Sequence, residues 1–235
     1  MSHELRTPLH GILSFADLGS TKALTATPEK LHHYFGKINQ SGKVLLALLN
    51  NLLDLSKLDA GRMVFEFQPI NLNVLLNTVA DEFGSLISKG SLTLHFIQPD
   101  VEAEAIIDPP QIMQVIRNLL SNAVKFSPIG GTIEISAHYS ERSVVVAVRD
   151  QGIGIPELER EVIFDKFIQS SKTKTGAGGT GLGLSICRQI ITAHQGRIWA
   201  ENRPDGGAVF SFELPLWGPN PAVTTSAVVG AGIQS

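Results

Sequence analysis

Three side chains near the start of the chain have types and spacing that suit proton and group transfer. His3 stands beside Glu4, and Thr7 follows four residues after His3. Residues four apart lie on the same face of a helix, so the imidazole and the hydroxyl would be neighbours. A neutral imidazole has a nucleophilic nitrogen, and a carboxylate can hold the proton on its other nitrogen. The alternative is an exposed helix histidine without a role, which is preferred from these residues alone.

Two asparagines and a lysine share one face of a helix predicted further along the chain. Asn118, Asn122 and Lys125 are four and three residues apart, which is helical spacing. An amide oxygen is a hard ligand that suits magnesium, and the lysine ammonium could neutralise a phosphate. The alternative is an ordinary solvated helix face, and this cluster by itself does not decide between the two interpretations.

An acidic residue and two glycines follow an apolar strand in the segment DQGIGIP. Asp150 stands at the end of this strand, where its carboxylate could accept a hydrogen bond from the amino group of a ligand. Gly152 and Gly154 would allow a ligand to approach the backbone closely. A tight turn is the alternative, and for this segment alone it is the preferred interpretation.

A second glycine-rich segment, GTGLGLSI, precedes a predicted helix. The unpaired N–H groups of the first helical turn could bind phosphate beside Gly179, Gly181 and Gly183. Lys172 in the preceding loop could reach the phosphates or simply be solvated. The glycines of this region also satisfy the dinucleotide pattern G-x-G-x-x-G, which requires a strand immediately before it. The preceding residues are polar, so we reject a dinucleotide site.

These candidate residues must be positioned by a mixture of helices and strands. Periodicity and capping residues predict main helices at 2–22, 28–60, 71–88, 109–126 and 181–194, and a short helix after Pro156. Apolar patterns predict strands at 92–97, 104–107, 132–138, 144–148, 197–200 and 208–214. The third and fourth of these strands should form a hairpin. Because helices and strands are mixed without strict alternation, we expect an α+β sandwich with helices on one face of a mixed sheet.

The second predicted helix carries a seven-residue repeat. Its members are Leu31, Ile38, Leu45 and Leu52. A neighbouring stripe contains Phe35, Leu48, Leu49 and Leu55. Such a repeat is typical of coiled-coil-like packing. Since one helical hairpin cannot bury both stripes, we expect two copies of the chain to form a four-helix bundle. The alternative is a helix that packs on the rest of its own chain.

The overall composition narrows the class of protein. Of the 235 residues, 43% are hydrophobic, and the net charge is −3, so a packed core is feasible and no nucleic acid is expected as a partner. The single cysteine, Cys187, excludes an internal disulfide and fits a reducing compartment. No apolar run approaches the roughly 18 residues that span a bilayer, and the N-terminus lacks a signal-peptide pattern. We therefore expect a cytoplasmic location.

The motifs follow one another in an order that resembles one family. Along the chain stand H-E-L-R-T-P, N-x-x-x-N-x-x-K, D-x-G-x-G, F-x-x-F and G-x-G-x-G. This order, with nearly every letter, resembles the transmitter region of sensor histidine kinases. The resemblance covers residues 2 to about 216, and the five motifs together are highly specific.

The resemblance implies two domains. Residues 1–62 would form a dimerisation and histidine-phosphotransfer hairpin, 63–69 a linker, and 70–217 a catalytic ATP-binding domain. The catalytic domain would have the Bergerat-type α/β sandwich of the GHKL class, shared with chaperone, gyrase and mismatch-repair ATPases. The tail at 218–235 is small, uncharged and aperiodic, so we expect it to be disordered.

The resemblance also implies roles for the candidate residues. His3 would be the phosphoacceptor, with His10 as the weaker rival. Glu4 would hold the proton on the far nitrogen of the imidazole, and Thr7 would orient a water that hydrolyses a phosphoryl aspartate on the partner. Asp150 would accept a hydrogen bond from the adenine amino group. The other contacts to ATP would come from Asn118, Asn122, Lys125, Gly152, Gly154, Lys172, Gly179, Thr180, Gly181, Leu182 and Gly183. Asn122 would also be the ligand of Mg2+.

The implied activity is ATP-dependent autophosphorylation of His3 and phosphotransfer to an aspartate of a response regulator receiver domain, together with phosphatase action on that regulator. The implied cofactors are ATP and Mg2+, and the implied assembly is a homodimer. Family members carry more helix before the phosphoacceptor, so we expect a fragment whose input domain, with any membrane attachment, lies upstream. Two alternatives are a nucleotide-gated binding module with weak or no kinase activity, and an ATPase of the same sandwich class that releases phosphate to water.

Overall fold

The computed structural model describes residues 2–97, 99, 104–173 and 180–216, without the side chains of residues 2–4. The tail at 218–235, for which we expect disorder, lies outside these residues. Across the described ranges, no helix combines the length and the apolar character needed to cross a bilayer.

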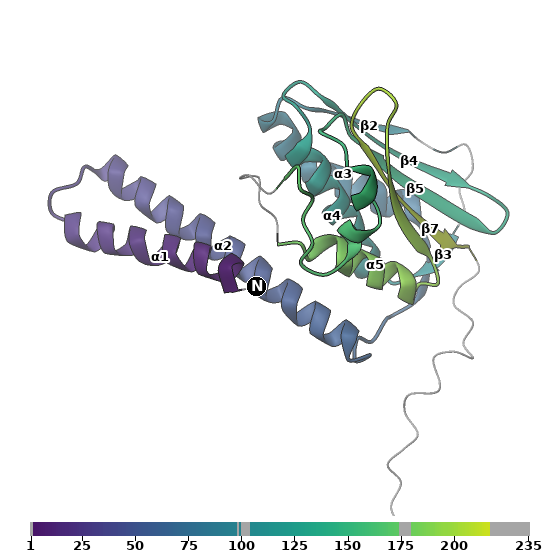
Figure 1. Cartoon of the computed structure of the whole chain (residues 1–235), viewed down its shortest axis with the longest axis horizontal. Helices are drawn as coiled ribbons and strands as arrows, with labels where there is room; N and C mark the ends of the chain where they lie inside the picture. Colours follow the sequence, from purple (N-terminus) through teal and green to yellow (C-terminus); the bar gives the residue numbers. More distant parts are fainter. Residues whose placement is uncertain (1, 98, 100–103, 174–179, 217–235) are drawn as a thin grey trace, which may run out of the picture.

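The first two helices form an antiparallel hairpin that projects from a mixed α/β body (Figure 1). They are α1 (Ser2–Lys22) and α2 (Pro28–Asp59), close to the predicted ranges. The Thr27 side chain begins α2 by accepting a hydrogen bond from the Lys30 N–H, and Pro28 occupies the first helical turn. The helix starts where the local sequence predicts it.

The body is built on a five-stranded sheet. Its strands, in spatial order, are β2 (Thr93–Ile97), β4 (Thr132–Tyr139), β5 (Ser143–Arg149), β7 (Ala208–Pro215) and β6 (Arg197–Asn202). β2 runs parallel to β4, and all other neighbouring strands are antiparallel. The sheet is therefore mixed, and β4 and β5 form the predicted hairpin.

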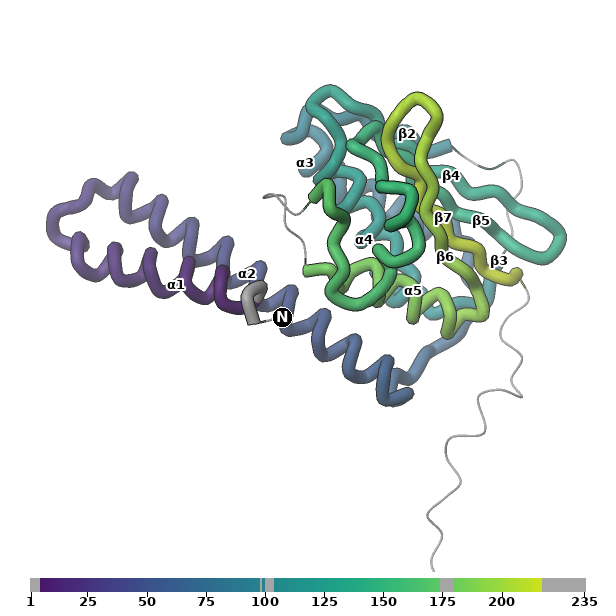
Figure 2. The backbone as a smooth tube through the Cα atoms, in the orientation of Figure 1, coloured from purple at the N-terminus to yellow at the C-terminus, as the bar shows by residue number. Residues whose placement is uncertain are grey.

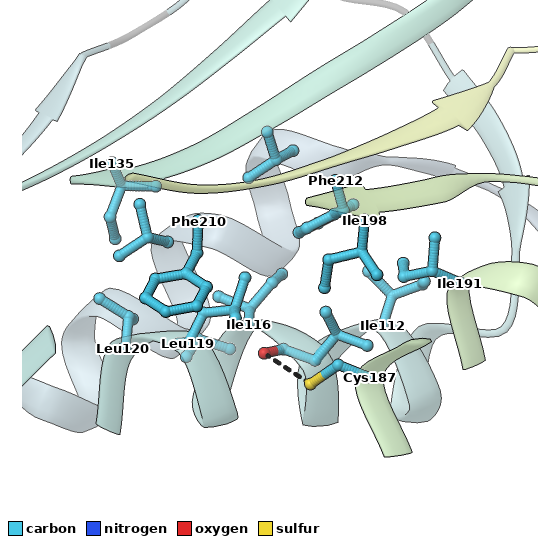
Figure 3. Close-up of a cluster of buried hydrophobic side chains, with 14 of the residues drawn as sticks. Ile112, Ile116, Leu119, Leu120, Ile135, Cys187, Ile191, Ile198, Phe210 and Phe212 are labelled. Carbon is cyan, nitrogen blue, oxygen red and sulfur yellow. Dashed lines mark hydrogen bonds between the residues drawn. The ribbon is translucent and has the colours of Figure 1, made fainter. Parts of the chain in front are cut away.

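Three helices cover one face of this sheet (Figure 1). They are α3 (Leu72–Lys89), α4 (Pro109–Phe126) and α5 (Gly183–Ala193). Apolar side chains of α4 and α5 point toward Ile135, Ile198, Phe210 and Phe212 of the sheet and form the buried core (Figure 3). The predicted α+β sandwich is confirmed.

Two short elements, a strand and a 3-10 turn, were not predicted. β1 (Gln68–Asn71) pairs with β3 (Glu104–Ile107) as a separate antiparallel ribbon. The 3-10 turn η1 (Glu157–Glu159) is the short helix expected after Pro156, whereas the 3-10 turn η2 (Val162–Phe164) was not expected. An element of three or four residues shows little hydrophobic periodicity, so sequence patterns reveal some of them, such as β3, and miss others.

The apolar stripes of α2 divide between two surroundings. Leu55 is 5% exposed and belongs to the core of the body, against which Leu52 and Leu58 also pack. Phe35, nearer the hairpin loop, is 64% exposed. The last turns of α2 continue past the start of α1 and run along the body (Figure 2). The end of α2 therefore packs on its own chain, as the alternative prediction states. The apolar residues Phe35, Leu46, Leu49 and Leu53 of α2 are exposed, and we refer to them as the open stripe.

Candidate functional site

A cavity of about 270 Å³ opens between α4, the start of α5 and the segment that follows β5. It brings together eight of the predicted site residues, namely Asn118, Asn122, Lys125, Asp150, Gly154, Thr180, Gly181 and Gly183. They come from three motifs far apart in the sequence, so the fold unites groups that were proposed separately.

Several predicted residues are not among those that line this cavity. The Lys172 ammonium donates a hydrogen bond to the Ile153 carbonyl at 2.8 Å. Leu182 is buried in the core, and a Cβ atom on Gly152 would meet the Phe126 carbonyl oxygen and the Asp150 side chain. Their predicted roles in binding ATP stay predictions.

The predicted residues of the first motif lie on α1. Helix α1 includes His3, Glu4 and Thr7, and the Thr7 side chain is exposed. The side chains of His3 and Glu4 lie outside the described part of the chain, as does the whole of Gly179. Their predicted roles stay predictions.

Asp150 is held with one oxygen occupied and the other available. The residue is 4% exposed, and its Oδ1 accepts hydrogen bonds from the N–H groups of Gly152 at 2.7 Å and Ala208 at 3.1 Å. Burial raises the pKa of Asp150, and these two hydrogen bonds lower it in part. No hydrogen bond among the described residues uses Oδ2. This oxygen can therefore accept an N–H group from a ligand in the cavity.

The backbone around Asp150 is fixed by close packing. A Cβ atom on Gly152 would lie 2.6 Å from the Phe126 carbonyl oxygen, so no side chain fits there. Asn202 on β6 accepts from the Ile155 N–H and donates to the Ile155 carbonyl, both at 2.7 Å. Sequence reasoning missed Asn202, because no motif marks an asparagine that acts on a loop 47 residues away.

The other wall of the cavity lies where α4 meets α5. The Asn118 Nδ2 group donates to the Gly183 carbonyl at 3.4 Å and contacts the Cys187 sulfur at 3.6 Å. No side chain caps the start of α5, so the backbone N–H groups of its first turn can bind an anion. The Lys125 ammonium lies 4.9 Å from the centre of the Phe126 ring. This wall combines the donors that phosphate groups require.

Cys187 itself is not a nucleophile in this site. The thiol is completely buried, and this burial raises its pKa to about 12. A thiol with such a pKa remains protonated at neutral pH, and only the thiolate is reactive. Its sulfur packs below the sheet, 4.0 Å from the Val115 carbonyl oxygen (Figure 3).

Thirteen lining residues were absent from the predicted site. They are Asn51, Ser121, Phe126, Ile153, Ile155, Ile163, Ile168, Gln169, Ser170, Thr173, Leu184, Ala208 and Phe210. Most are apolar, and an apolar residue of a cavity wall has the same sequence pattern as a core residue. Seven of them lie inside or directly beside the predicted motifs, so position in or next to a motif was the one available signal. These seven are Ser121, Phe126, Ile153, Ile155, Ile163, Ile168 and Leu184.

The donor set also limits how a metal ion could be held. Within the described residues, no group of three or more His, Cys, Asp or Glu side chains could hold a metal ion. An ion in this cavity would need most of its ligands from the substrate and from water. Mg2+ is usually bound in that way, through one or two protein oxygens plus phosphates. The Asn122 amide, which lines the cavity, fits such a role.

Comparisons with known proteins place both parts of the chain in one family. Residues 1–61 match the His Kinase A (phospho-acceptor) domain. Residues 107–218 match the histidine kinase-, DNA gyrase B-, and HSP90-like ATPase family. The two matches occur in the order that the motifs predict.

Individual relatives agree with these matches. The sensor histidine kinase RcsC of Salmonella typhimurium is 36% identical over 234 residues, which are 99% of this chain and 24% of RcsC. The chain thus spans about a quarter of the length of this curated relative. The catalytic domain of histidine kinase ThkA is 37% identical with a TM-score of 0.57, covering 66% of this chain and all of that domain. ThkA in complex with the response regulator protein TrrA is 35% identical with a TM-score of 0.72, covering 92% of this chain and 59% of the other. This chain belongs to the histidine kinase family.

Proposed function

We propose that the chain is the kinase core of a two-component sensor. It phosphorylates His3 with ATP, passes the phosphoryl group to an aspartate of a response regulator, and also removes it from that regulator. The cavity carries this proposal, because one wall offers the free Asp150 oxygen for an adenine amino group and another offers donors for phosphates. In the proposed division, residues 1–62 are the phosphotransfer hairpin and 70–217 the ATP-binding domain.

The side chains of the cavity have separate tasks in this proposal. Asp150 Oδ2 accepts from the adenine amino group, which selects this base. Lys125 and the first turn of α5 bind the phosphates, and the Asn122 amide oxygen would hold Mg2+. The metal, when bound, would neutralise part of the negative charge of the phosphates. Phosphoryl transfer depends mainly on such positioning and charge neutralisation.

In the transfer itself, a ring nitrogen of His3 forms a bond to the γ-phosphorus, and the bond from that phosphorus to the bridging oxygen of ADP breaks. The other ring nitrogen keeps its proton, which Glu4 holds while positive charge develops on the imidazole. Thr7 lies one helical turn from His3 on α1. In the phosphatase reaction, its hydroxyl orients the water that hydrolyses the phosphoryl aspartate of the regulator.

The partners follow from the same resemblance. ThkA has been solved together with its response regulator TrrA, which supports a receiver domain as the partner of this chain. The match of 1–61 to a phosphoacceptor domain and the open stripe on α2 support a homodimer. The similarity to sensor histidine kinases does not favour a nucleotide-gated module without transfer.

Labelled ATP tests the proposed function. The full chain is incubated with ATP labelled at the γ-phosphate and Mg2+, and we expect a phosphoprotein that is labile in acid and stable in base. The label should be lost in His3→Ala and retained in the control His10→Ala, an exposed histidine two turns along α1. Label released only as free phosphate would indicate an ATPase, and nucleotide binding without any transfer would indicate a binding module. Either result contradicts the proposal.

A further inference from the structure

One residue of the cavity wall comes from the helical hairpin. Asn51 belongs to α2, whereas every other described lining residue lies between Asn118 and Phe210. Asn51 is half-buried, so its position in the wall depends on where α2 lies against the body.

Three contacts hold the end of α2 against the body. Asp54 accepts a hydrogen bond from the Gln114 amide at 3.1 Å. Leu55 of the next position is buried in the core of the body. In the last turn, Asp59 accepts from the Lys166 ammonium at 2.6 Å. We refer to the contacts of Asp59 as the clasp.

The clasp has a second donor on α5. The Gln189 amide donates to Asp59 Oδ1 at 2.8 Å. The carboxylate of Asp59 thus joins the hairpin helix to α5 and to Lys166, just after η2. The Lys166 contact lowers the pKa of Asp59 the most, so this carboxylate is charged at neutral pH.

The contact between Asp54 and Gln114 places Asn51 near the part of α4 that lines the cavity. Asn51 lies three residues before Asp54, and Asn118 lies four residues after Gln114, the partner of Asp54. Asn51 and Asn118 both line the cavity, one from each of these two helices. Asn118 in turn contacts Gly183, the first residue of α5. Asn51 therefore faces the wall to which we assign the phosphates.

We propose that Asn51 is a nucleotide-binding residue which the hairpin contributes to the phosphate side of the cavity. This inference rests on the proposed function, because the ligand is the nucleotide named there. An asparagine amide can donate to a phosphate oxygen through Nδ2 or accept from a water of the metal through Oδ1. The site is complete only while α2 is docked.

Docking of α2 and binding of nucleotide are then coupled. A ligand that binds the docked arrangement more tightly shifts the protein toward it, and the coupling free energy is the same in both directions. Loosening the clasp, which lies on the last turn of α2 and away from the cavity wall, must therefore weaken nucleotide binding. This connects the position of the phosphoacceptor hairpin to the state of the ATP site.

Titration calorimetry with a non-hydrolysable ATP analogue and Mg2+ tests the coupling in the full chain. Asn51→Ala should weaken binding about 5- to 10-fold, the loss of one hydrogen bond. Asp59→Asn should weaken it about two- to fivefold, since exposed ion pairs contribute little. The double variant should bind no more weakly than Asn51→Ala alone, because the clasp acts through Asn51. The matched control is Asn50→Ala, the same change on the exposed neighbouring residue, which should bind like the unaltered chain.

The outcomes separate this inference from the proposed function. If the unaltered chain does not bind the analogue, the proposed function itself fails. If the unaltered chain binds and Asn122→Ala weakens binding, but Asn51→Ala binds as tightly as Asn50→Ala, only the role of Asn51 is wrong. Additive losses in the double variant would show that the clasp does not act through Asn51.

Discussion

Asp150 shows how a buried carboxylate can be prepared for one ligand. Two backbone N–H groups share its Oδ1, and Oδ2 is left for the cavity. Burial raises the pKa of this carboxyl group, which means that burial destabilises its charged form. A donor from a ligand would offset that cost. A raised pKa together with a cavity is typical of a functional residue.

The variant Asp150→Asn tests this role at the scale of one residue. The amide keeps the shape, and its oxygen can still accept from Gly152 and Ala208, so Nδ2 replaces the free acceptor with a donor. We expect ATP-analogue affinity to fall about 10- to 100-fold, the effect of an unpaired buried polar group. Calorimetry measures the affinity, and thermal unfolding should show that the fold survives. Equal affinities for a folded variant and the unaltered chain would remove Asp150 from the binding site.

Several elements meet at His194, at the end of α5. Its Nδ1 contacts the Ile190 carbonyl at 2.8 Å, and its Nε2 accepts from the Asp108 N–H at 3.0 Å. Because the first partner only accepts and the second only donates, the ring is neutral with its proton on Nδ1. The rings of Phe65 and Phe67, which lie between α2 and β1, contact the imidazole with centroids 5.5 and 5.0 Å away.

Asp108 completes this junction. Its two carboxylate oxygens accept from the backbone N–H groups of Gln111, in the first turn of α4, and of Glu66, in the segment after α2. Hydrogen bonds and ring contacts thus join the segment after α2 to the start of α4 and to the end of α5.

The junction predicts a loss of stability in acid. Burial lowers the pKa of His194 in the folded protein below its ordinary value of 6.5. The unfolded chain therefore binds more protons, so the stabilisation is complete above about pH 6.5 and is lost as the pH falls toward the folded-state pKa. His194→Gln should lower the free energy of unfolding at pH 7.5 by about 1–3 kcal/mol and flatten its decrease between about pH 7 and 5. Denaturant unfolding at several pH values measures both.

The control for this prediction is His95→Gln, because His95 is exposed on β2. This variant should keep the pH dependence of the unaltered chain. If His194→Gln also keeps it, the imidazole of His194 does not cause the loss of stability in acid.

For the whole molecule, the open stripe of α2 is the main unexplained surface. Phe35, Leu46, Leu49 and Leu53 recur at helical spacing, and all four are exposed. Leu9 and Leu13 of α1 are exposed as well. Exposed apolar patches of this kind mark interaction sites, and the heptad pattern of α2 suits a second hairpin as the partner.

This surface predicts a dimer in solution. Light scattering after size-exclusion chromatography should give about twice the chain mass of 25.3 kDa. Introducing charges with Leu46→Glu and Leu53→Glu should shift the protein toward the monomer, because burying unpaired charges is costly. The matched change Leu24→Glu affects a leucine that is 101% exposed near the hairpin loop, and it should leave the dimer intact. A monomeric unaltered chain would contradict the four-helix bundle.

Most elements could be predicted because their signals are local. Thr27, Asn71 and Asp108 each cap a helix through a hydrogen bond to a residue two or three positions ahead. The alternation of β4 and β5 likewise shows in neighbouring residues. β1 escaped prediction, since a four-residue strand is defined by its pairing with β3 and not by its own pattern.

The sequence by itself determined the family, the order of the domains and half of the polar side chains that line the cavity, because the motifs and their chemistry lie in short segments. Only the tertiary structure decided that Asn51 joins the cavity, that Asn202 holds the loop after Asp150, and that Lys172 donates to the Ile153 carbonyl. These contacts join residues 19 or more positions apart, and the distance between such residues depends on how the helices and the sheet pack.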